Sequence, residues 1–474
     1  MTFHAMATYK VAEHRGAPRV FVESQKLTNA GFHPGVLFSV RVDHEKRHLT
    51  LTLDHAGTHT VSRRKGTTGD TPVIDLNSKV LLEPFKGLDA VRMVVRDAEI
   101  HFLPLASNLA AKERLQRLAD KLERGESLDT ASICAGAGLM SYALEQGYRA
   151  GGVTTRQALV NEIDVTYVEQ AITHNPAVGT TPLILNAPMQ EVVQDEWLMR
   201  QLPKVEIAEL SLPCSGASSA GKAKRGLVAM EEHPEVGHLV AAALMLLQKL
   251  QPAVVVVENV PAYKSTGSAW IMRHMLRDMG YSIEETELHG KDFGVLEDRH
   301  RWFMVATTAG LTINLDELKP TLVALPRVDS VLDQSIADDD PRWTGFNYLK
   351  TKQDRDVAKG NGFMMQTVNP ADASVPTLRK GYAKGGSTDP LLVHPTNANL
   401  LRKFTATEHA AIKGFPHALL ANLSETTAHQ ILGQAVLFKP VFALGRRIAE
   451  AMRHLQRGTV ATVATSYSLC SATG

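Results

Sequence analysis

The chain has 474 residues, of which 44% are hydrophobic and 21% charged, and its formal net charge is +1. This length favours two or three domains, and the hydrophobic content is ordinary for a soluble globular protein. Because the net charge is close to zero, affinity for nucleic acid must come from local basic patches. The first residues lack the basic and apolar regions of a signal peptide, and no apolar run is long enough to cross a membrane. We therefore expect a cytoplasmic protein with no membrane partner.

Cysteine usage excludes two further classes. The three cysteines, Cys134, Cys214 and Cys470, lie far apart, and none forms a Cys-x-x-Cys pair. This spacing predicts neither a disulfide framework nor a zinc site, so we expect no metal. It also fits a reducing compartment such as the cytoplasm.

Residues 1–105 are predicted to form a β-rich accessory domain. Short strands are expected at 20–22, 38–42 and 49–53. A weak repeat is visible, in which 32–36 is echoed by 85–88, 20–22 by 73–74, and 49–53 by 100–103. The pattern is similar to the swapped-hairpin barrels of the AbrB and SymE type, with both halves on one chain. That resemblance implies DNA binding; the alternative is a β domain that only packs against the rest of the protein.

Residues 106–125 are predicted to form a linker helix, because they are rich in Ala, Leu, Lys, Arg and Glu and carry an apolar stripe. The stripe consists of Leu109, Leu115, Leu118 and Leu122. From Leu128 onward, strands and helices alternate, which predicts an α/β fold with a mostly parallel sheet.

A glycine turn, Gly136-Ala137-Gly138, follows the first strand of this α/β region. Glycines at such a turn let the backbone approach a cofactor at the carboxyl end of the sheet. Glu162 ends the next strand, where a carboxylate can bind a ribose diol. The alternative for Glu162 is an ordinary surface carboxylate.

Pro213 and Cys214 stand between an apolar strand and a loop of glycine, serine and alanine. Proline fixes φ just before the thiol, and the small residues let another molecule come close to the backbone. Lys222, Lys224 and Arg225 add positive charge to the same loop. The alternatives are a buried structural cysteine and a solvated basic turn.

Two further motifs lie beside apolar strands. The strand 253–257 ends in Glu258-Asn259, and Arg299 and Arg301 precede another apolar run. One thiol, one carboxylate and two guanidiniums at strand ends can make a covalent-catalysis site. In this order, Pro-Cys, Glu-Asn-Val and Arg-x-Arg resemble the motifs of the DNA cytosine-5 methyltransferase family.

The resemblance covers residues 128–455 and implies a Rossmann-like domain that uses S-adenosylmethionine. It implies a DNA (cytosine-5-)-methyltransferase, which flips a cytosine out of double-stranded DNA and methylates carbon 5 through a covalent Cys214 adduct. The implied catalytic residues are Cys214, Glu258, Asn259, Arg299 and Arg301. The implied cofactor-binding residues are Cys134, Ala135, Gly136, Ala137, Gly138, Leu139, Glu162, Ile163, Asn186, Ala187, Pro213, Leu239, Gln434, Ala435 and Val436. The implied DNA-binding residues are Ser215, Gly216, Ser218, Lys222, Lys224, Arg225 and Thr377.

Several positions depart from the family's pattern. In the glycine motif, Ser132, Cys134 and Leu139 replace the usual Asp, Phe and Gly. The other departures are Asn186 for an Asp, Glu297 for a Gln, and Gln434 for an Asn. The changes at 132, 134, 139 and 186 bear on cofactor contacts, whereas Cys214, Glu258, Arg299 and Arg301 are intact.

The predicted catalytic domain spans 126–318, followed by a target-recognition region at 319–425 and a final helix at 426–456. Within the recognition region, 320–370 is expected to form loops with little regular structure. Residues 433–436 are expected to open the helix that returns to the catalytic domain. A mobile tail is expected from residue 457 to residue 474.

Two other functions stay open at this point. One branch of the family methylates tRNA cytosine with the same residues, and the departures at Ser132, Leu139 and Asn186 would suit a catalytically silent DNA-binding regulator. For the methyltransferase we expect a monomer in a bacterial or phage-infected cytoplasm, associated with the nucleoid. A cognate restriction endonuclease is a further expected partner.

Overall fold

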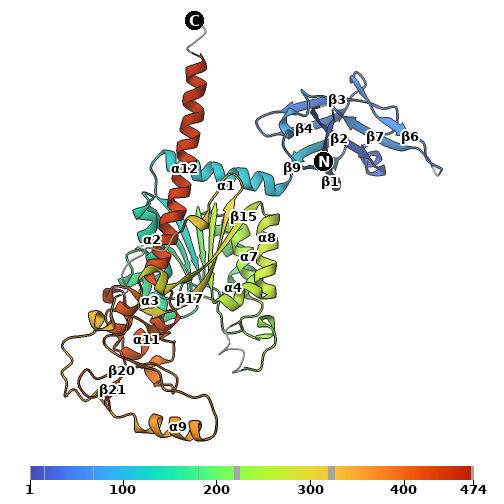
Figure 1. Ribbon diagram of the computed structural model, residues 1–474. Helices are drawn as coiled ribbons and strands as arrows, with labels where there is room; N and C mark the ends of the chain where they lie inside the picture. Colours follow the sequence, from blue (N-terminus) through green and yellow to red (C-terminus); the bar gives the residue numbers. More distant parts are fainter. Residues whose placement is uncertain are drawn as a thin grey trace. The chain divides into compact units, whose positions relative to one another are not determined.

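The computed structural model describes residues 2–14, 16–67, 69–179, 181–217, 225–318 and 326–470, with side chains through residue 455. The chain divides into two compact units, Met1–Ala110 and Ala111–Gly474. Each unit has its own buried apolar core. Figure 1 shows the elements of both units, and each unit is described by itself below.

The first unit is built from β-strands. They are β1 (Phe3–His14), β2 (Ala17–Glu23), β3 (Leu37–Asp43), β4 (His48–Leu53), β5 (His59–Thr60), β6 (Ser62–Arg64), β7 (Thr71–Leu76), β8 (Ala90–Arg96) and β9 (Glu99–Pro104). They form one sheet in the order β5-β3-β4-β9-β8-β1-β2-β7-β6, and every pairing is antiparallel. The strands expected at 20–22, 38–42 and 49–53 are therefore confirmed as β2, β3 and β4.

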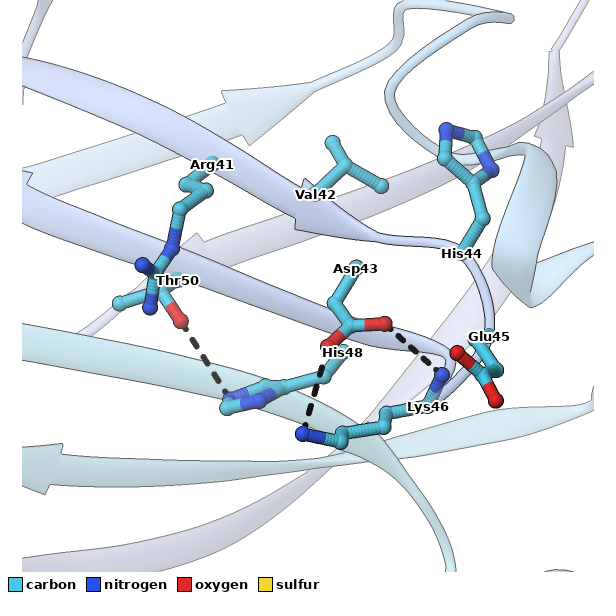
Figure 2. Close-up of a pocket in the computed structure, with 8 residues that line it drawn as sticks. All are labelled: Arg41, Val42, Asp43, His44, Glu45, Lys46, His48 and Thr50. Atoms are coloured by element: carbon cyan, nitrogen blue, oxygen red, sulfur yellow. Dashed lines mark hydrogen bonds and ion pairs between the residues drawn. The ribbon is translucent and has the colours of Figure 1, made fainter.

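The repeat in the sequence corresponds to symmetric strand pairing in the structure. Each half contributes a strand, a short 3-10 turn and a hairpin, in the orders β2-β3-β4 and β7-β8-β9. Equivalent strands then pair with each other, β4 with β9 at Thr50 opposite His101, and β2 with β7 at Val22 opposite Ile74. A polar pocket lies on the β3–β4 hairpin of the first half (Figure 2). It is lined by Arg41, Val42, Asp43, His44, Glu45, Lys46, His48 and Thr50.

The second unit is organised around a seven-stranded sheet. Its strands are β10 (Leu128–Ile133), β11 (Thr155–Asn161), β12 (Leu183–Leu185), β13 (Ile207–Leu210), β14 (Val254–Asn259), β15 (Tyr281–His289) and β17 (His300–Thr308). The order is β12-β11-β10-β13-β14-β17-β15, and only β17 runs antiparallel to its neighbours. The mostly parallel sheet predicted from Leu128 is confirmed. The strand order reverses at β10, where doubly wound sheets bind ligands beyond the carboxyl ends of their strands.

Helices cover both faces of this sheet (Figure 1). They are α1 (Ala106–Glu123), α2 (Leu139–Ala150), α3 (Val165–His174), α4 (Met189–Gln194), α5 (Glu196–Gln201), α7 (Leu239–Leu250), α8 (Gly267–Asp278) and α12 (Phe438–Cys470). Helices α2 and α12 share one buried core with one face of the sheet, and α4, α7 and α8 share another with the opposite face. The sheet is apolar on both faces because both are covered.

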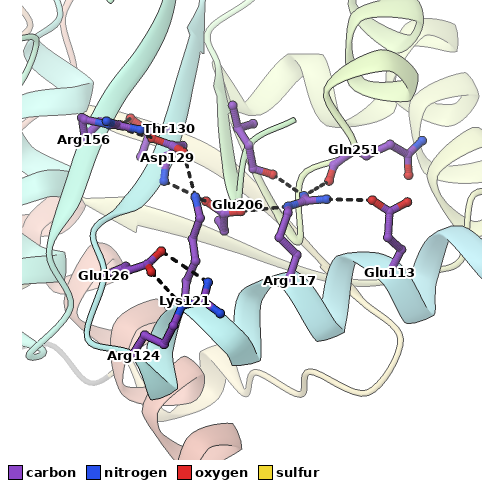
Figure 3. Close-up of polar contacts among 11 residues, drawn as sticks. Glu113, Arg117, Lys121, Arg124, Glu126, Asp129, Thr130, Arg156, Glu206 and Gln251 are labelled. Carbon is purple, nitrogen blue, oxygen red and sulfur yellow. Dashed lines mark hydrogen bonds and ion pairs between the residues drawn. The ribbon is translucent and has the colours of Figure 1, made fainter. Parts of the chain in front are cut away.

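Helix α1 is fixed to the sheet by a buried carboxylate (Figure 3). Glu206 has no exposed surface, and its two oxygens accept from Arg117 Nε at 2.8 Å and from Lys121 Nζ at 2.6 Å. The backbone N–H of Asp129 also donates to Glu206, at 2.8 Å. From Ala111 onward, the predicted linker helix is therefore part of the second unit.

A smaller region is formed by β16 (Glu297–Asp298), which comes just before β17 in the chain, and by elements that follow β17. Those elements are β18 (Thr367–Val368), β19 (Val375–Pro376), β20 (Leu391–Val393), β21 (Leu401–Arg402), α9 (Asn347–Ala358), α10 (Ala406–Lys413) and α11 (Glu425–Gln434). The expectation of loops across 320–370 is wrong at α9. That helix buries only Leu349 and is otherwise polar, with an i,i+4 ion pair between Lys352 and Asp356, so it lacks the apolar stripe that marks a helix in sequence.

The expected course of the last helix is also corrected. Residues 433–436 do not open a helix: α11 ends at Gln434, and α12 begins only at Phe438. Ser424 caps the start of α11 by accepting from the N–H of Thr427, which explains why the earlier helix begins where it does. Helix α12 then extends to Cys470, beyond the boundary at 457 that was predicted for a mobile tail.

Candidate active site

Cys214 lies just beyond the carboxyl end of β13, in a partly buried position. Its carbonyl accepts from the N–H of Ala217 at 2.9 Å, so the chain turns immediately after the thiol. A side chain at Gly216 would place its Cβ 2.8 Å from the carbonyl oxygen of Met230. The nucleophile loop therefore needs glycine here, because the backbones approach too closely for any other residue.

Glu258 and Asn259 end the neighbouring strand β14. The amide of Asn259 donates to the carbonyl oxygen of Leu212 at 2.9 Å and so ties this strand to the loop that carries Cys214. Glu258 is buried and forms an ion pair with Arg301, whose Nε lies 2.8 Å from Oε1. The acid and one of the two predicted arginines thus stand together.

Arg299 and Arg301 lie on either side of the start of β17. Arg299 is buried and donates from Nη2 to the carbonyl oxygen of Gly433 at 3.0 Å. Burial lowers the pKa of Arg299 to about 10, with Arg301 acting in the same direction. The guanidinium therefore stays charged at neutral pH and supplies a fixed positive charge to the site.

The environment of the thiol is set by opposing effects. Burial raises the pKa of Cys214, Arg301 and Arg299 act to lower it, and the carboxylate of Glu258 acts to raise it. The strands β13, β14 and β17 are neighbours in the sheet, so the thiol, the acid and both guanidiniums lie at the ends of adjacent strands. All of the predicted catalytic residues are thus brought to one edge of the sheet, with Asn259 as the link between two strands.

The other described thiol has a different environment. Cys134 adopts a positive φ of 55° at the end of β10, and burial together with Glu162 raises its pKa far above the ordinary value. A thiol held neutral in this way is a poor nucleophile. Between the two, only Cys214 has cationic neighbours that favour a thiolate.

The glycine turn after β10 has the shape that its sequence predicts. Gly136 and Gly138 adopt positive φ values of 57° and 72°, and nothing lies within 4 Å of a Cβ built on Gly136. Glu162 accepts from the N–H of Gly136 at 2.8 Å and also from those of Ile163 and Asp164. Its carboxylate therefore holds the turn at the carboxyl ends of β10 and β11.

The other implied cofactor residues fall into two groups. Asn186 is exposed and donates to the carbonyl oxygen of Glu162 at 2.7 Å, so it lies beside the same turn. Gln434 is also exposed, and its side chain donates to the Tyr167 hydroxyl at 3.0 Å. Leu239 and Val436, by contrast, are buried within the apolar cores.

The implied DNA-binding residues are placed only in part. Ser218, Lys222 and Lys224 lie outside the described residues. Ser215 is exposed next to the nucleophile, and Arg225 lies 3.5 Å from Glu235. The Thr377 hydroxyl donates to the carbonyl oxygen of Asp298 at 2.5 Å, which joins the recognition region to the arginine motif.

The structure contains a buried carboxyl group that was not predicted from the sequence. Glu209 on β13 is fully buried, and its Oε2 accepts from Ser132 at 2.9 Å and from Ser141 at 2.6 Å. Burial raises the pKa of Glu209 to about 7. One signal in the sequence pointed to this arrangement, namely Ser132 in place of the usual Asp. Because serine carries no carboxylate, the acidic group beneath the glycine turn has to come from another strand.

Among the described residues, no group of three or more His, Cys, Asp or Glu side chains is arranged to hold a metal ion. Within the same part of the chain, no helix has the length and apolar character needed to span a membrane.

Comparison with known proteins matches the family described as C-5 cytosine-specific DNA methylase to residues 128–450. The Type II methyltransferase M1.ScrFI of Lactococcus lactis subsp. cremoris is 26% identical over 263 residues, covering 53% of this chain and 64% of that protein. A tRNA (cytosine(38)-C(5))-methyltransferase of Schizosaccharomyces pombe is 24% identical over 208 residues, covering 40% of this chain and 62% of that protein. The chain thus spans just under two thirds of the length of these relatives.

The crystal structure of the S. pombe Dnmt2 methyltransferase has a TM-score of 0.51 and 17% identity, covering 67% of this chain and 96% of that one. At this identity the likeness shows the fold alone, the mixed α/β fold of S-adenosylmethionine-dependent C5 methyltransferases. The matched residues 128–450 make up more than half of the chain and include Cys214, Glu258 and Arg299. The chain therefore belongs to the C-5 cytosine-specific DNA methylase family.

Proposed function

We propose that the chain is a DNA (cytosine-5-)-methyltransferase acting on double-stranded DNA. The observation that carries this proposal is the convergence of Cys214, the Glu258–Arg301 ion pair and Arg299 at one edge of the sheet. Among the side chains that the structure describes, the other thiol is that of Cys134, and burial together with Glu162 holds it neutral.

Carbon 5 of cytosine is too weak a nucleophile to take a methyl group directly. Addition of the Cys214 thiolate to carbon 6 converts the ring into an enamine, whose electron density gathers at carbon 5. Glu258 contacts N3 and the exocyclic amine and supplies the proton that N3 takes up as the thiolate adds. Arg301 contacts the cytosine O2 and, through its ion pair, orients the carboxyl group of Glu258.

Turnover then requires the adduct to break. A base, assigned to water, removes the proton from carbon 5, and the electrons left behind expel the Cys214 thiolate from carbon 6. N3 returns its proton to Glu258 as the adduct breaks, so the acid is restored. The nearby guanidiniums of Arg299 and Arg301 stabilise the thiolate both before attack and after release. Since carbon 6 is inaccessible in a stacked duplex, the cytosine must be flipped into the site.

The family's cofactor is S-adenosylmethionine, and the residues of the glycine turn fit it. The open space over Gly136 admits a ligand close to the backbone, and Glu162 stands at the end of β11, where ribose hydroxyls are bound in related sheets. Cys134 and Asn186 border the same turn. When bound, the cofactor supplies the methyl group that carbon 5 receives.

The first test replaces the nucleophile. We expect Cys214→Ala to abolish methyl transfer while binding to duplex DNA survives, because the side chain is small and only partly buried. DNA containing 5-fluorocytosine should trap a covalent adduct with the wild-type protein and none with the variant, as seen by denaturing electrophoresis. Cys470→Ala, outside the matched residues 128–450, is the control and should still form the adduct. Methyl transfer by Cys214→Ala above a few per cent of wild type would refute the covalent mechanism.

A second candidate is methylation of RNA, which the similarity to a tRNA (cytosine(38)-C(5))-methyltransferase favours. The same catalytic residues serve both substrates, so only the substrate distinguishes them. Parallel assays with duplex DNA and with tRNA, using labelled cofactor, decide between the two. Transfer to tRNA alone would replace our first proposal.

The similarity to Type II methyltransferases also supports a role in restriction–modification, with a cognate endonuclease as partner. Bisulfite sequencing of DNA from cells expressing the chain should then show methylated cytosine within one short recognition sequence. A silent regulator would bind DNA but leave it unmethylated, and calorimetry would detect no cofactor binding at millimolar concentration.

A further inference from the structure

A second charged cluster lies directly behind the arginine motif. Glu297 is fully buried, two residues before Arg299, at the position where the family usually has a Gln. Its Oε1 accepts from the backbone N–H of Leu378 at 2.9 Å and lies 3.4 Å from Nη1 of Arg299. Its Oε2 forms an ion pair with Lys413, which is also fully buried. One carboxylate is thus shared between two cations and a backbone donor.

This cluster joins elements that are far apart in sequence. Glu297 lies on β16, which pairs with β19 of the recognition region. Lys413 is the last residue of α10, and Arg299 reaches across to the carbonyl oxygen of Gly433 on α11. The Glu297 carboxylate is therefore the point where the recognition region meets the guanidinium that neighbours Cys214.

Within the cluster, the single negative charge of Glu297 faces two cations, Arg299 and Lys413. Burial, with Arg299 nearby, lowers the pKa of Lys413, whereas the Glu297 carboxylate acts to raise it. Burial holds the pKa of the adjacent His409 well below its ordinary value, with Lys413 acting in the same direction, so that His409 adds no cation. A buried charge without a partner is strongly unfavourable, so Lys413 and Glu297 depend on each other.

We propose that Glu297 and Lys413 act as a pair of positioning residues for Arg299. Glu297 holds the guanidinium in place, and Lys413 takes the second oxygen of the carboxylate so that Arg299 is not drawn away from Cys214. A Gln at 297 needs no such counterion, and in this chain the substituted carboxylate and the lysine form one unit. The role assigned to Arg299 rests on the proposed function, whereas the pairing itself rests on the contacts.

The test measures the reactivity of Cys214 without DNA or cofactor. Alkylation of the folded full-length chain by iodoacetamide is followed by mass spectrometry of the Cys214 peptide across a pH series. Without Lys413, the carboxylate should pull Arg299 closer to itself, and the thiol should lose part of its stabilisation. We expect Lys413→Gln to raise the apparent pKa of the thiol by about half a unit or more, which slows alkylation at pH 8 by about threefold.

Two further variants keep the proposal falsifiable if Lys413→Gln does not fold. The double variant E297Q/K413Q restores a neutral, hydrogen-bonded pair and should return the alkylation profile to that of the wild type. Lys413→Arg keeps the charge and should also leave the profile unchanged. A rise in the thiol pKa of the double variant, or a wild-type profile in folded Lys413→Gln, would overturn the proposal.

The matched control is Arg402→Gln. Arg402 and Glu408 form an equally buried ion pair in the same region, with N–O distances of 2.7 and 2.6 Å, but neither hydrogen-bonds to Arg299. Loss of that pair should lower the thermal stability without moving the alkylation profile. If Arg402→Gln shifts the profile as much as Lys413→Gln does, the effect is general loosening and the proposal fails. Since no methyl transfer is measured, failure here is distinct from failure of the proposed function.

Discussion

At the scale of single residues, the site works through groups whose charge is set by their neighbours. Glu258 is buried and forms an ion pair with Arg301, so its carboxyl group is oriented toward that guanidinium. Cys214 is surrounded by two cations and one anion. Substitutions that change one charge here should alter chemistry more than folding.

Glu258→Gln tests the assigned acid. The amide keeps the size of the side chain but cannot transfer the proton that N3 needs, so we expect turnover to fall by about a hundredfold or more. Affinity for S-adenosylmethionine, measured by calorimetry, should change little, because Glu258 lies with Cys214 and not beside the glycine turn. A collapse of cofactor affinity would instead make Glu258 a structural residue.

Glu209 is the clearest pH-sensitive group in the core. Its pKa rises from 4.5 to about 7 because the carboxyl group is fully buried, although the hydroxyls of Ser132 and Ser141 donate to it and act in the opposite direction. Between these two values the folded protein binds more protons than the unfolded chain, so this group makes stability fall as the pH rises. The cost is complete above pH 7 and amounts to about 3 kcal/mol.

We therefore expect Glu209→Gln to gain stability over wild type as the pH rises. The amide cannot ionise, but its oxygen can still accept from Ser132 and Ser141. Urea unfolding gives the free energy of unfolding of both proteins at pH 5 and at pH 8. The difference between them, variant minus wild type, should be larger at pH 8 by about 2 kcal/mol or more. Parallel pH curves for the two proteins would show that the carboxyl group is not protonated in the folded state.

At the scale of elements, helices α2 and α12 meet at glycines. A Cβ on Gly147 would lie 2.2 Å from the carbonyl oxygen of Phe442, and one on Gly445 would lie 2.6 Å from that of Leu144. The backbones are thus in direct contact. This contact fixes the returning helix beside α2, the helix that begins at the glycine turn.

Gly147→Ala should therefore force the two helices apart, even though alanine favours helix formation. We expect a loss of about 1–3 kcal/mol, the usual cost of overpacking a core. Gly381→Ala is the control, because a Cβ there meets nothing within 4 Å. Thermal unfolding should separate the two variants, and equal melting temperatures would contradict the close packing.

Periodicity and motif order were enough to predict the parallel sheet, α1, α7 and the four charged or nucleophilic side chains of the site. They failed where the pattern carries no apolar stripe, as in α9, and where a cap decides the boundary, as at Ser424. They also could not find Glu209 or the Glu297–Lys413 pair. Each of those contacts joins side chains on separate elements, and no local spacing in one sequence encodes them.

At the scale of the whole molecule, the role of the first unit stays a prediction. We propose that residues 1–105 add DNA affinity to the catalytic unit. Exposed basic residues lie on its hairpins, although several are partly neutralised: Arg64 lies 2.6 Å from Glu23, and Arg63 lies 3.5 Å from Asp70. The pocket of Figure 2 mixes both signs of charge in the same way.

Truncation tests this role. A chain starting at Ala106 keeps α1 and its contacts with the buried Glu206. Because Lys and Arg release counterions from DNA when they neutralise phosphates, we expect the truncated chain to bind duplex DNA more weakly. Its salt slope should be shallower by about one unit for each lost phosphate contact. Identical affinity and slope would leave the first unit a packing or partner-binding domain.

The symmetric pairing of β4 with β9 and of β2 with β7 has a consequence for divergence. In a symmetric homodimer every substitution appears twice, so the two sides of the axis must stay alike. Here both halves lie on one chain, and Thr50 already faces His101 where a homodimer would place the same residue opposite itself. The two halves can therefore diverge in sequence, and the same backbone fold, used twice, can present two different surfaces.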